Sequence, residues 1–290
     1  MKQRLGLIAA MVILVQFSYA QVAFKIYNKA GKEVSLEEVV KKAKKSDIIL
    51  FGEQHANPII HWMQLRLTQA IYTKTEALTL GAEMFESDNQ LLINEYFAGI
   101  IRQKDFEKEA RLWDNYKTDY KPLLEFANSK KLKFVATNIP RRYAAVVNKK
   151  GFEGLDGLSE EAKALIMPLP IVFDTVNPSV VKMMEMDFGH GKGGPGAMKM
   201  AKAQSVKDAT MAHFILENLE KKTPFIHFQG DFHSAHYGGI YWYLKNEKPK
   251  LNVVTISGIS ASGELEFRPE YAERGDYILL VADDMTQTSR

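Results

Sequence analysis

The sequence predicts an α/β protein with a mostly parallel central sheet, flanking helices and a helical insertion or cap. Short apolar runs recur along the chain of 290 residues, and amphipathic stretches separate them. Continuous apolar runs are typical of strands covered on both faces. Strand and helix patterns that alternate at this spacing indicate βαβ units. The stretch from about 151 to 222 departs from this alternation, because it has helical patterns and no clear strand pattern.

The predicted strands are the apolar runs at 47–51, 77–85, 132–138, 225–228, 252–257 and 277–282. The predicted helices are the amphipathic stretches at 36–44, 59–72, 90–97, 120–129 and 203–219. Hydrophobic residues make up 46% of the chain and charged residues 25%, as in an ordinary globular protein. We therefore expect a single α/β domain over residues 21–290, with the helical insertion at about 151–222.

The first twenty residues have the pattern of a secretory signal peptide. Lys2 and Arg4 precede an apolar stretch from Leu5 to Phe17, and small residues lead up to Ala20. The apolar stretch is shorter than the roughly 20 residues that a membrane-spanning helix needs. We expect cleavage after residue 20 and an exported protein, periplasmic or envelope-associated, that is soluble once the signal is removed. An ordinary N-terminal helix or anchor is the alternative.

The composition excludes several classes of function. The chain has no cysteine, which rules out disulfides, thiolate-bound metals, a cysteine nucleophile and a lipid-anchored cysteine. The formal net charge is +3, and two of these positive charges lie in the signal sequence. This balance gives no electrostatic footprint for nucleic acid. The His-Glu-x-x-His and dinucleotide-binding motifs are absent from the sequence, which disfavours those two enzyme classes.

Two Gly-x-x-His motifs, Gly52 to His55 and Gly230 to His233, each follow an apolar strand. Side chains alternate along a strand, so Glu53 and His55 are expected to point the same way. Ligands bind at the carboxyl edge of open α/β sheets, which makes these motifs candidates for one shared crevice. A purely structural pair of polar side chains is the alternative. His227, inside a strand, is expected to be a core residue.

Glu83, at the end of another predicted strand, has apolar neighbours. A carboxylate in such surroundings needs a partner, such as a histidine, a metal ion or a ligand donor. Glu86 is expected instead to be a solvated residue at a helix start. His61 and His213 are expected on helix surfaces.

Trp113, Tyr116 and Tyr120 suit the wall of a large flat ligand, because such rings combine an apolar body with a polar tip. Ordinary core packing is the alternative. Arg141 and Arg142 follow Asn-x-Pro, which marks a helix start. Two guanidinium groups at a helix N-terminus could hold a carboxylate or phosphate, and an exposed helix start is the alternative.

The stretch from His190 to Gly196 is rich in glycine. It is either a flexible linker between helices or a flap that carries His190 over the site. Methionines concentrate between Met183 and Met211, and methionine is favoured on surfaces that accept large apolar ligands. Core filling is the alternative.

Taken in order, several motifs resemble those of the ChaN-like haem-binding uptake proteins, a family within the Tiki and erythromycin-esterase-like superfamily. The motifs extend over roughly residues 47–258. They are Gly52-Glu53-x-His55, Glu83-x-Phe85, Trp113 to Tyr116, Tyr120-x-Pro122, Asn138-x-Pro140-Arg141, Ala203-Gln204, Asp208-x-x-Met211-Ala212 and Gly230-x-x-His233.

The resemblance implies a sheet flanked by helices, an envelope location and a role in haem or iron acquisition. It also implies iron ligation by a tyrosine, with Tyr116, Tyr120, Tyr143 and Tyr237 as candidates, and pairing into a homodimer. An outer-membrane haem receptor is a possible partner. Many relatives are lipoproteins, and this chain departs from them because it has no cysteine to carry a lipid.

Two functional hypotheses follow. In the first, the protein binds haem or a related porphyrin, with Trp113, Tyr116, Tyr120 and His190 around the macrocycle and Arg141 or Arg142 on its propionates. In the second, which the wider superfamily suggests, it is a metal-dependent hydrolase. His55, His233 and either Glu83 or Glu53 would then bind a divalent metal ion, and the carboxylate not bound to the ion would act as the catalytic base on a metal-bound water.

Overall fold

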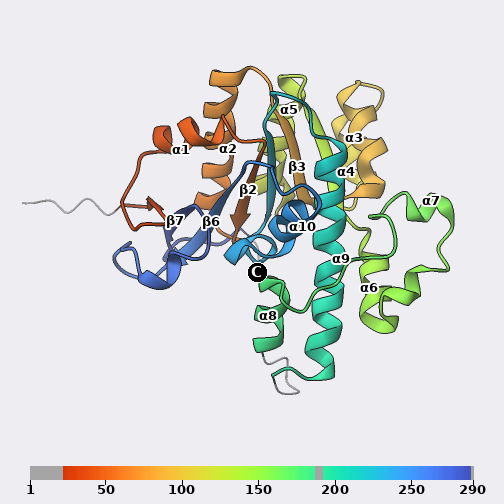
Figure 1. The fold of residues 1–290 in the computed structure, drawn as a ribbon. Helices are drawn as coiled ribbons and strands as arrows, with labels where there is room; N and C mark the ends of the chain where they lie inside the picture. The colour runs from red at the N-terminus through yellow and green to blue at the C-terminus, as the bar shows by residue number, and fades with distance from the viewer. Residues whose placement is uncertain (1–21, 187–191, 289–290) are drawn as a thin grey trace, which may run out of the picture.

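The computed structural model describes residues 22–186 and 192–288. The signal-peptide prediction and His190 lie outside the described residues. The described chain forms a seven-stranded sheet of order β1-β7-β6-β2-β5-β3-β4. Every neighbouring pair of strands is parallel except β1 and β7. This sheet, with helices on its faces (Figure 1), confirms the predicted fold class.

The strands are β1 (Phe24–Asn28), β2 (Ile48–Glu53), β3 (Thr79–Glu86), β4 (Lys133–Asn138), β5 (Phe225–Gly230), β6 (Val253–Ala261) and β7 (Tyr277–Ala282). The predicted strands correspond to β2 through β7. The sequence pattern missed β1, an edge strand whose residues are partly polar.

The helices are α1 (Leu36–Ala43), α2 (Pro58–Thr75), α3 (Gln90–Phe97), α4 (Gln103–Glu109), α5 (Lys121–Ser129), α6 (Arg141–Lys150), α7 (Glu160–Lys163), α8 (Pro178–Glu185), α9 (Pro195–Glu217) and α10 (Gly239–Glu247). Helix α9 begins well before the predicted start at 203. Within the described residues, no helix is both long enough and apolar enough to cross a membrane.

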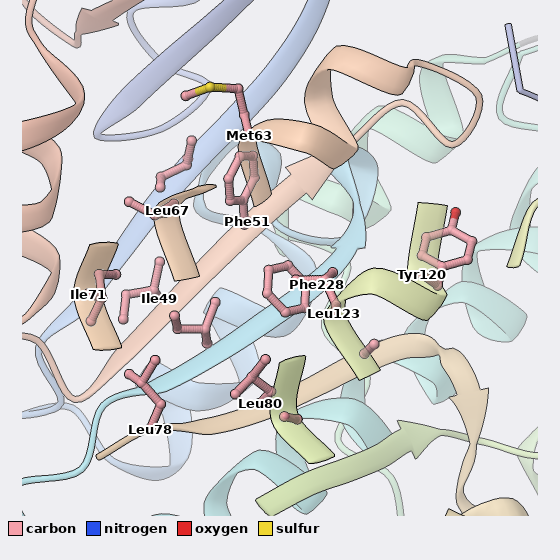
Figure 2. Close-up of a cluster of buried hydrophobic side chains, with 14 of the residues drawn as sticks. Ile49, Phe51, Met63, Leu67, Ile71, Leu78, Leu80, Tyr120, Leu123 and Phe228 are labelled. Carbon is pink, nitrogen blue, oxygen red and sulfur yellow. The ribbon is translucent and has the colours of Figure 1, made fainter. Parts of the chain in front are cut away.

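Alternation along β2 divides the core between the two faces of the sheet. Ile49 and Phe51 join a hydrophobic cluster with α2 and α5, part of which is shown in Figure 2. Ile48 and Leu50 join a second cluster with α9 and α10. Because successive side chains of a strand point to opposite faces, a strand buried on both faces is apolar at most successive positions. This is why the run at 48–51 lacks the polar alternation of a half-exposed strand.

Residues 151–222 include α7, α8 and α9. The carboxyl half of α9 packs against the sheet, where Ala209, Ala212 and Ile215 belong to the second cluster. Helix α8 and the amino half of α9 extend beyond the end of the sheet, at the bottom of Figure 1. The carboxyl ends of the parallel strands point toward these two helices, so the fold places helical side chains opposite the strand ends.

Candidate functional site

A cavity of about 1040 Å³ lies at the carboxyl edge of the sheet. Its size is at the upper end of the roughly 300–1,000 Å³ typical of small-molecule sites. Side chains from the ends of β2, β3 and β5 form part of the wall, and α8 and α9 supply the opposite part. The acidic and histidine side chains of the wall are Glu53, His55, Glu83, Glu86, Asp114, Asp231, His233 and His236. Its basic, amide, aromatic and methionine side chains include Arg141, Lys182, Lys207, Arg274, Gln204, Trp113, Phe232, Met183, Met186 and Met200.

The two Gly-x-x-His motifs lie side by side. Strands β2 and β5 are parallel neighbours, and their register pairs Glu53 with Gly230. A Cβ atom on Gly230 would lie 2.8 Å from Nε2 of His55, closer than real Cβ contacts allow. Glycine at 230 therefore lets the imidazole of His55 rest directly on the end of the neighbouring strand.

Glu53 is a buried carboxylate with three hydrogen-bond donors around it. The hydroxyl of Tyr120 donates to Oε1 over 2.8 Å, and Nε2 of Gln64 donates to Oε2 over 2.7 Å. Nδ1 of His55 lies 2.9 Å from Oε1. Burial alone would raise the pKa of Glu53, but the hydrogen bond from His55 and the neighbouring His61 outweigh it and lower this pKa. Glu53 is therefore ionised and fixes the ring of His55.

His233 lies between two buried carboxylates. Its Nε2 is 3.0 Å from Oε1 of Glu83, and its Nδ1 makes a short contact with Oδ1 of Asp208. The backbone N–H of Gly230 donates to Oε2 of Glu83 over 2.7 Å. Burial would lower the pKa of His233, but the charges of Glu83 and Asp208 raise it to about 10. The same pairing lowers the pKa of Glu83 despite its burial. The arrangement is an imidazolium held between acids.

We call Glu53, His55, Glu83, Asp208 and His233 the charged cluster. The strand-end residues predicted to meet do so here, and α9 adds Asp208 and Gln204, whose Nε2 lies 2.9 Å from Nδ1 of His233. The two helix residues occur in the family motif, but sequence spacing gave no sign of their contact with His233. That contact depends on how α9 packs across the strand ends.

The cluster does not have the form of a metal centre. Among residues 22–186 and 192–288, no group of three or more histidine or acidic side chains is placed to hold a metal ion. Both ring nitrogens of His233 already face carboxylates, and Nδ1 of His55 faces Glu53. The predicted ligands His55, His233 and Glu83 do lie close together. Their polar atoms, however, contact other side chains of the cluster and leave no shared position for a metal ion.

The predicted aromatic residues divide between core and cavity. Trp113 lines the cavity and packs edge-on against His55, with ring centroids 4.9 Å apart. Tyr120 is 1% exposed and its hydroxyl is bound to Glu53. Tyr116 is also buried, and its hydroxyl has no hydrogen-bond partner in the described structure. Neither tyrosine is among the described residues that line the cavity.

Arg141 starts α6 at the cavity wall, as the sequence predicted, and its side chain is largely exposed. Its Nε lies 2.5 Å from Oε1 of Glu86. The other carboxylate oxygen of Glu86, Oε2, accepts a hydrogen bond from Nε of Arg111 over 3.2 Å. The prediction that Glu86 is solvated is wrong, because the residue is 4% exposed. Two guanidinium groups compensate its buried charge.

The prediction of a surface position is also wrong for His61. This residue is buried, with Nε2 3.0 Å from the carbonyl oxygen of His55 and 3.4 Å from Oδ2 of Asp119. It supports the loop that carries His55. His227 is a core residue, as predicted, and its ring nitrogens contact Thr137 and Gln229.

A second group of cavity residues has fewer partners. We call Met186, Met200, Lys207 and His236 the cavity rim. Both methionines are 41% exposed. Lys207 and the imidazole of His236 are partly exposed, and neither has a hydrogen-bond or ion-pair partner within the described parts of the chain. The rim therefore offers apolar surface, one cation and one imidazole to a ligand.

The sequence model of the family described as "Haem-binding uptake, Tiki superfamily, ChaN" matches residues 39–244, most of the chain. The protein belongs to this family. No curated protein matches the sequence.

The ChaN family fold is also found among solved structures. The ChaN protein of Campylobacter jejuni, whose structure is described as showing cofacial haem binding, has a TM-score of 0.65 and 18% identity, with 89% of this chain and 96% of that chain covered. A succinoglycan biosynthesis protein has a TM-score of 0.51 and 12% identity, with coverage of 85% and 90%. A Bacillus cereus protein has a TM-score of 0.51 and 11% identity, with coverage of 86% and 92%. At these identities the structures show the ChaN-like fold alone.

Proposed function

We propose that this protein binds haem in the cavity at the carboxyl edge of the sheet and that it serves haem or iron acquisition. The observation that carries the proposal is that the side chains of the cavity rim lack protein partners in the described chain, in a protein that belongs to a haem-binding family. A porphyrin needs apolar walls, positive charges for its carboxylates and a donor atom for its iron. The described wall has all three.

The apolar part of the wall comes from α8 and α9. Met183, Met186 and Met200 line the cavity with Phe232. Methionine side chains are polarisable and flexible, so they adapt to a large flat ligand. The methionine-rich segment noted in the sequence therefore supports a macrocycle-binding face.

The basic part of the wall suits the two propionates of haem. Lys207 is partly exposed and has no ion-pair partner in the described chain. Arg141 and Arg274 also line the cavity, but each is already paired, with Glu86 and Asp231 respectively. We therefore assign Lys207 the leading role in holding a propionate, with Arg141, which also lines the cavity, in a secondary role.

When bound, haem would supply an iron centre with one or two axial positions for protein ligands. The charged cluster would contribute a fixed, hydrogen-bonded part of the cavity wall. Export, an envelope location, delivery to or from an outer-membrane haem receptor and pairing into a homodimer belong to the same proposal. They rest on the N-terminal sequence pattern and the family.

Hemin titration tests the proposal. Purified protein lacking residues 1–20 should produce a saturable, shifted Soret band with a fixed stoichiometry. Lys207→Glu should weaken binding by placing a negative charge beside the propionates. Absence of saturable binding by the unaltered protein would refute the proposal.

A second candidate function is hydrolysis, and the charged cluster favours it. Titratable side chains with displaced pKa values that meet in a cavity are a general mark of catalytic sites. Burial and charge pairing displace the pKa values of Glu83 and His233 here. The carboxylates of Glu53 and Glu83 could act as bases on a water molecule, with or without a divalent metal ion.

Hydrolysis of a chromogenic ester, with metal analysis of protein purified without chelator, tests this alternative. Turnover lost in Glu83→Gln and His233→Ala would support it. Turnover unaffected by both changes would refute it.

A further inference from the structure

His236 occupies a distinctive place at the cavity rim. It lies in the short 3₁₀ turn Ala235–Tyr237, which follows the Gly-x-x-His motif of β5. It lines the large cavity and also a neighbouring hollow of about 550 Å³, whose wall includes Val181 and Tyr237. The imidazole therefore borders both open volumes.

The backbone at this turn is strained. His236 has φ 58° and Tyr237 has φ 57°, so two successive non-glycine residues adopt the left-handed conformation. Non-glycine residues rarely adopt this conformation, and those that do cluster at functional sites. The N–H of His236 donates to the carbonyl oxygen of Arg274 over 3.1 Å, which holds the turn in place. The fold thus maintains an unfavourable conformation that keeps the ring of residue 236 at the rim.

The ring nitrogens of His236 are available. No hydrogen bond or ion pair engages them within the described residues, whereas His55 and His233 face carboxylates. The charged groups that face His236 are Arg274, Lys182, Asp231 and Glu273. Burial, followed by the positive charges of Arg274 and Lys182, lowers the pKa of His236 below its ordinary value. A neutral imidazole has the free lone pair that an iron ion needs.

The histidines of the charged cluster are less suited to this role. Nδ1 of His55 lies 2.9 Å from Oε1 of Glu53, and the edge of its ring that carries Nε2 rests on Gly230. Both ring nitrogens of His233 lie beside carboxylates. The fold therefore already engages or covers the ring nitrogens of these two histidines.

The tyrosines are also poorly placed. The hydroxyl of Tyr237 donates to Oδ1 of Asp276 over 3.2 Å. This hydroxyl is therefore already engaged within the fold, and Tyr237 is not among the described residues that line the large cavity. Tyr116 and Tyr120 are buried and are not among the described residues that line the cavity. Tyr143 packs against the hydrophobic cluster beside α6 and is also absent from the described cavity wall.

We propose that His236 is the side chain that ligates the haem iron in this protein. The proposal rests on the proposed haem-binding function. It assigns a residue outside the tyrosines that the family resemblance suggested, because His236 combines a place on the cavity wall with unengaged ring nitrogens.

The test compares hemin-loaded wild-type protein with His236→Gly. Glycine adopts φ near 58° without strain, so this change removes the imidazole and preserves the turn. The wild-type absorption and EPR spectra should indicate imidazole ligation. His236→Gly should lose that signature, and its haem affinity should fall at least about tenfold, as for loss of a metal-site residue. Added free imidazole should restore the spectrum, which a merely structural role would not explain.

Two further variants complete the test. His213→Ala removes a histidine of α9 that is not among the described residues of the cavity wall, and it should leave the spectrum unchanged. Tyr237→Phe should also retain the imidazole signature.

The outcomes separate the two proposals. If wild-type protein binds hemin and His236→Gly keeps the same spectrum, His236 is not the ligand, while haem binding stands. A spectrum that changes only in Tyr237→Phe would likewise overturn the assignment. If the wild type does not bind hemin, the proposed function itself fails.

Discussion

The charged cluster and the cavity rim border the same cavity, but they differ in the partners that the fold gives them. In the cluster, Glu53, Glu83 and His233 are buried and hydrogen-bonded within the protein. At the rim, Lys207 and the ring of His236 have no such partner in the described chain. Polar groups without internal partners can exchange water for ligand at a lower cost than groups that must first break protein hydrogen bonds.

This difference separates two tasks. The cluster fixes the strand ends and the position of His55, so it gives the site its shape. The rim supplies contacts that a ligand can still make. We therefore expect substitutions in the cluster to change mainly the stability of the protein and substitutions at the rim to change mainly binding.

The largest expected effect is that of Glu83→Ala on stability. Removal of this carboxylate leaves the imidazolium of His233 with one acidic partner in a buried site. Breaking a buried ion pair in this way typically costs about 3–5 kcal/mol. Chemical denaturation should show a loss of that size in the free energy of unfolding. A loss below about 1 kcal/mol would mean that the cluster is not an ionised network.

The pH dependence of stability should come next. The folded-state pKa of His233, about 10, lies above its ordinary value of 6.5. The contribution of His233 to the free energy of unfolding is therefore fully present below about pH 6.5. It is lost as the pH rises through about 10, by at most about 1.4 kcal/mol per pH unit. Denaturation between pH 7 and 10 should show stability falling with pH. Glu83→Gln should flatten this slope, because it removes the charge that raises the pKa.

Gly230→Ala should have an intermediate effect. The added Cβ would meet the ring of His55 at 2.8 Å, so either the ring or the strand end must move. Overpacking of this kind costs about 1–3 kcal/mol. Gly157→Ala is a matched control, because no atom lies within 4 Å of its added Cβ. Equal stability of the two variants would contradict the close packing of β2 and β5.

The smallest effect should be that of Lys207→Ala. An exposed charge pair contributes about 0.2–1 kcal/mol, so hemin affinity should fall by no more than about fivefold. The stability of the unliganded protein should change by less than about 0.5 kcal/mol. The iron complex of protoporphyrin dimethyl ester should bind the wild-type protein and Lys207→Ala equally, since this ligand has no free carboxylate to pair with Lys207. Equal weakening for both ligands would show that Lys207 acts through something other than charge.

The sequence predicted the sheet well because β2 through β6 are covered on both faces and are therefore apolar over several successive positions. It missed β1, an edge strand that carries polar residues. The convergence of Glu53, Glu83 and His233 followed from a simple rule, since carboxyl ends of parallel strands share one edge.

The rest of the site depended on tertiary packing. The burial of His61 under the loop of His55 has no signature in the sequence of α2, and the burial of Glu86 depends on Arg111 and Arg141, which lie far along the chain. The contact of Asp208 with His233 requires α9 to cross the strand ends. Sequence spacing cannot reveal such contacts, because they join separate elements.

The most direct test of the contrast between cluster and rim is the protonation state of two histidines in the unliganded protein. Nitrogen-15 NMR of labelled imidazoles at pH 8 should show His233 protonated on both nitrogens and His236 neutral. His233→Ala and His236→Gly would assign the two signals. A neutral His233, or a His236 still protonated at that pH, would contradict the account.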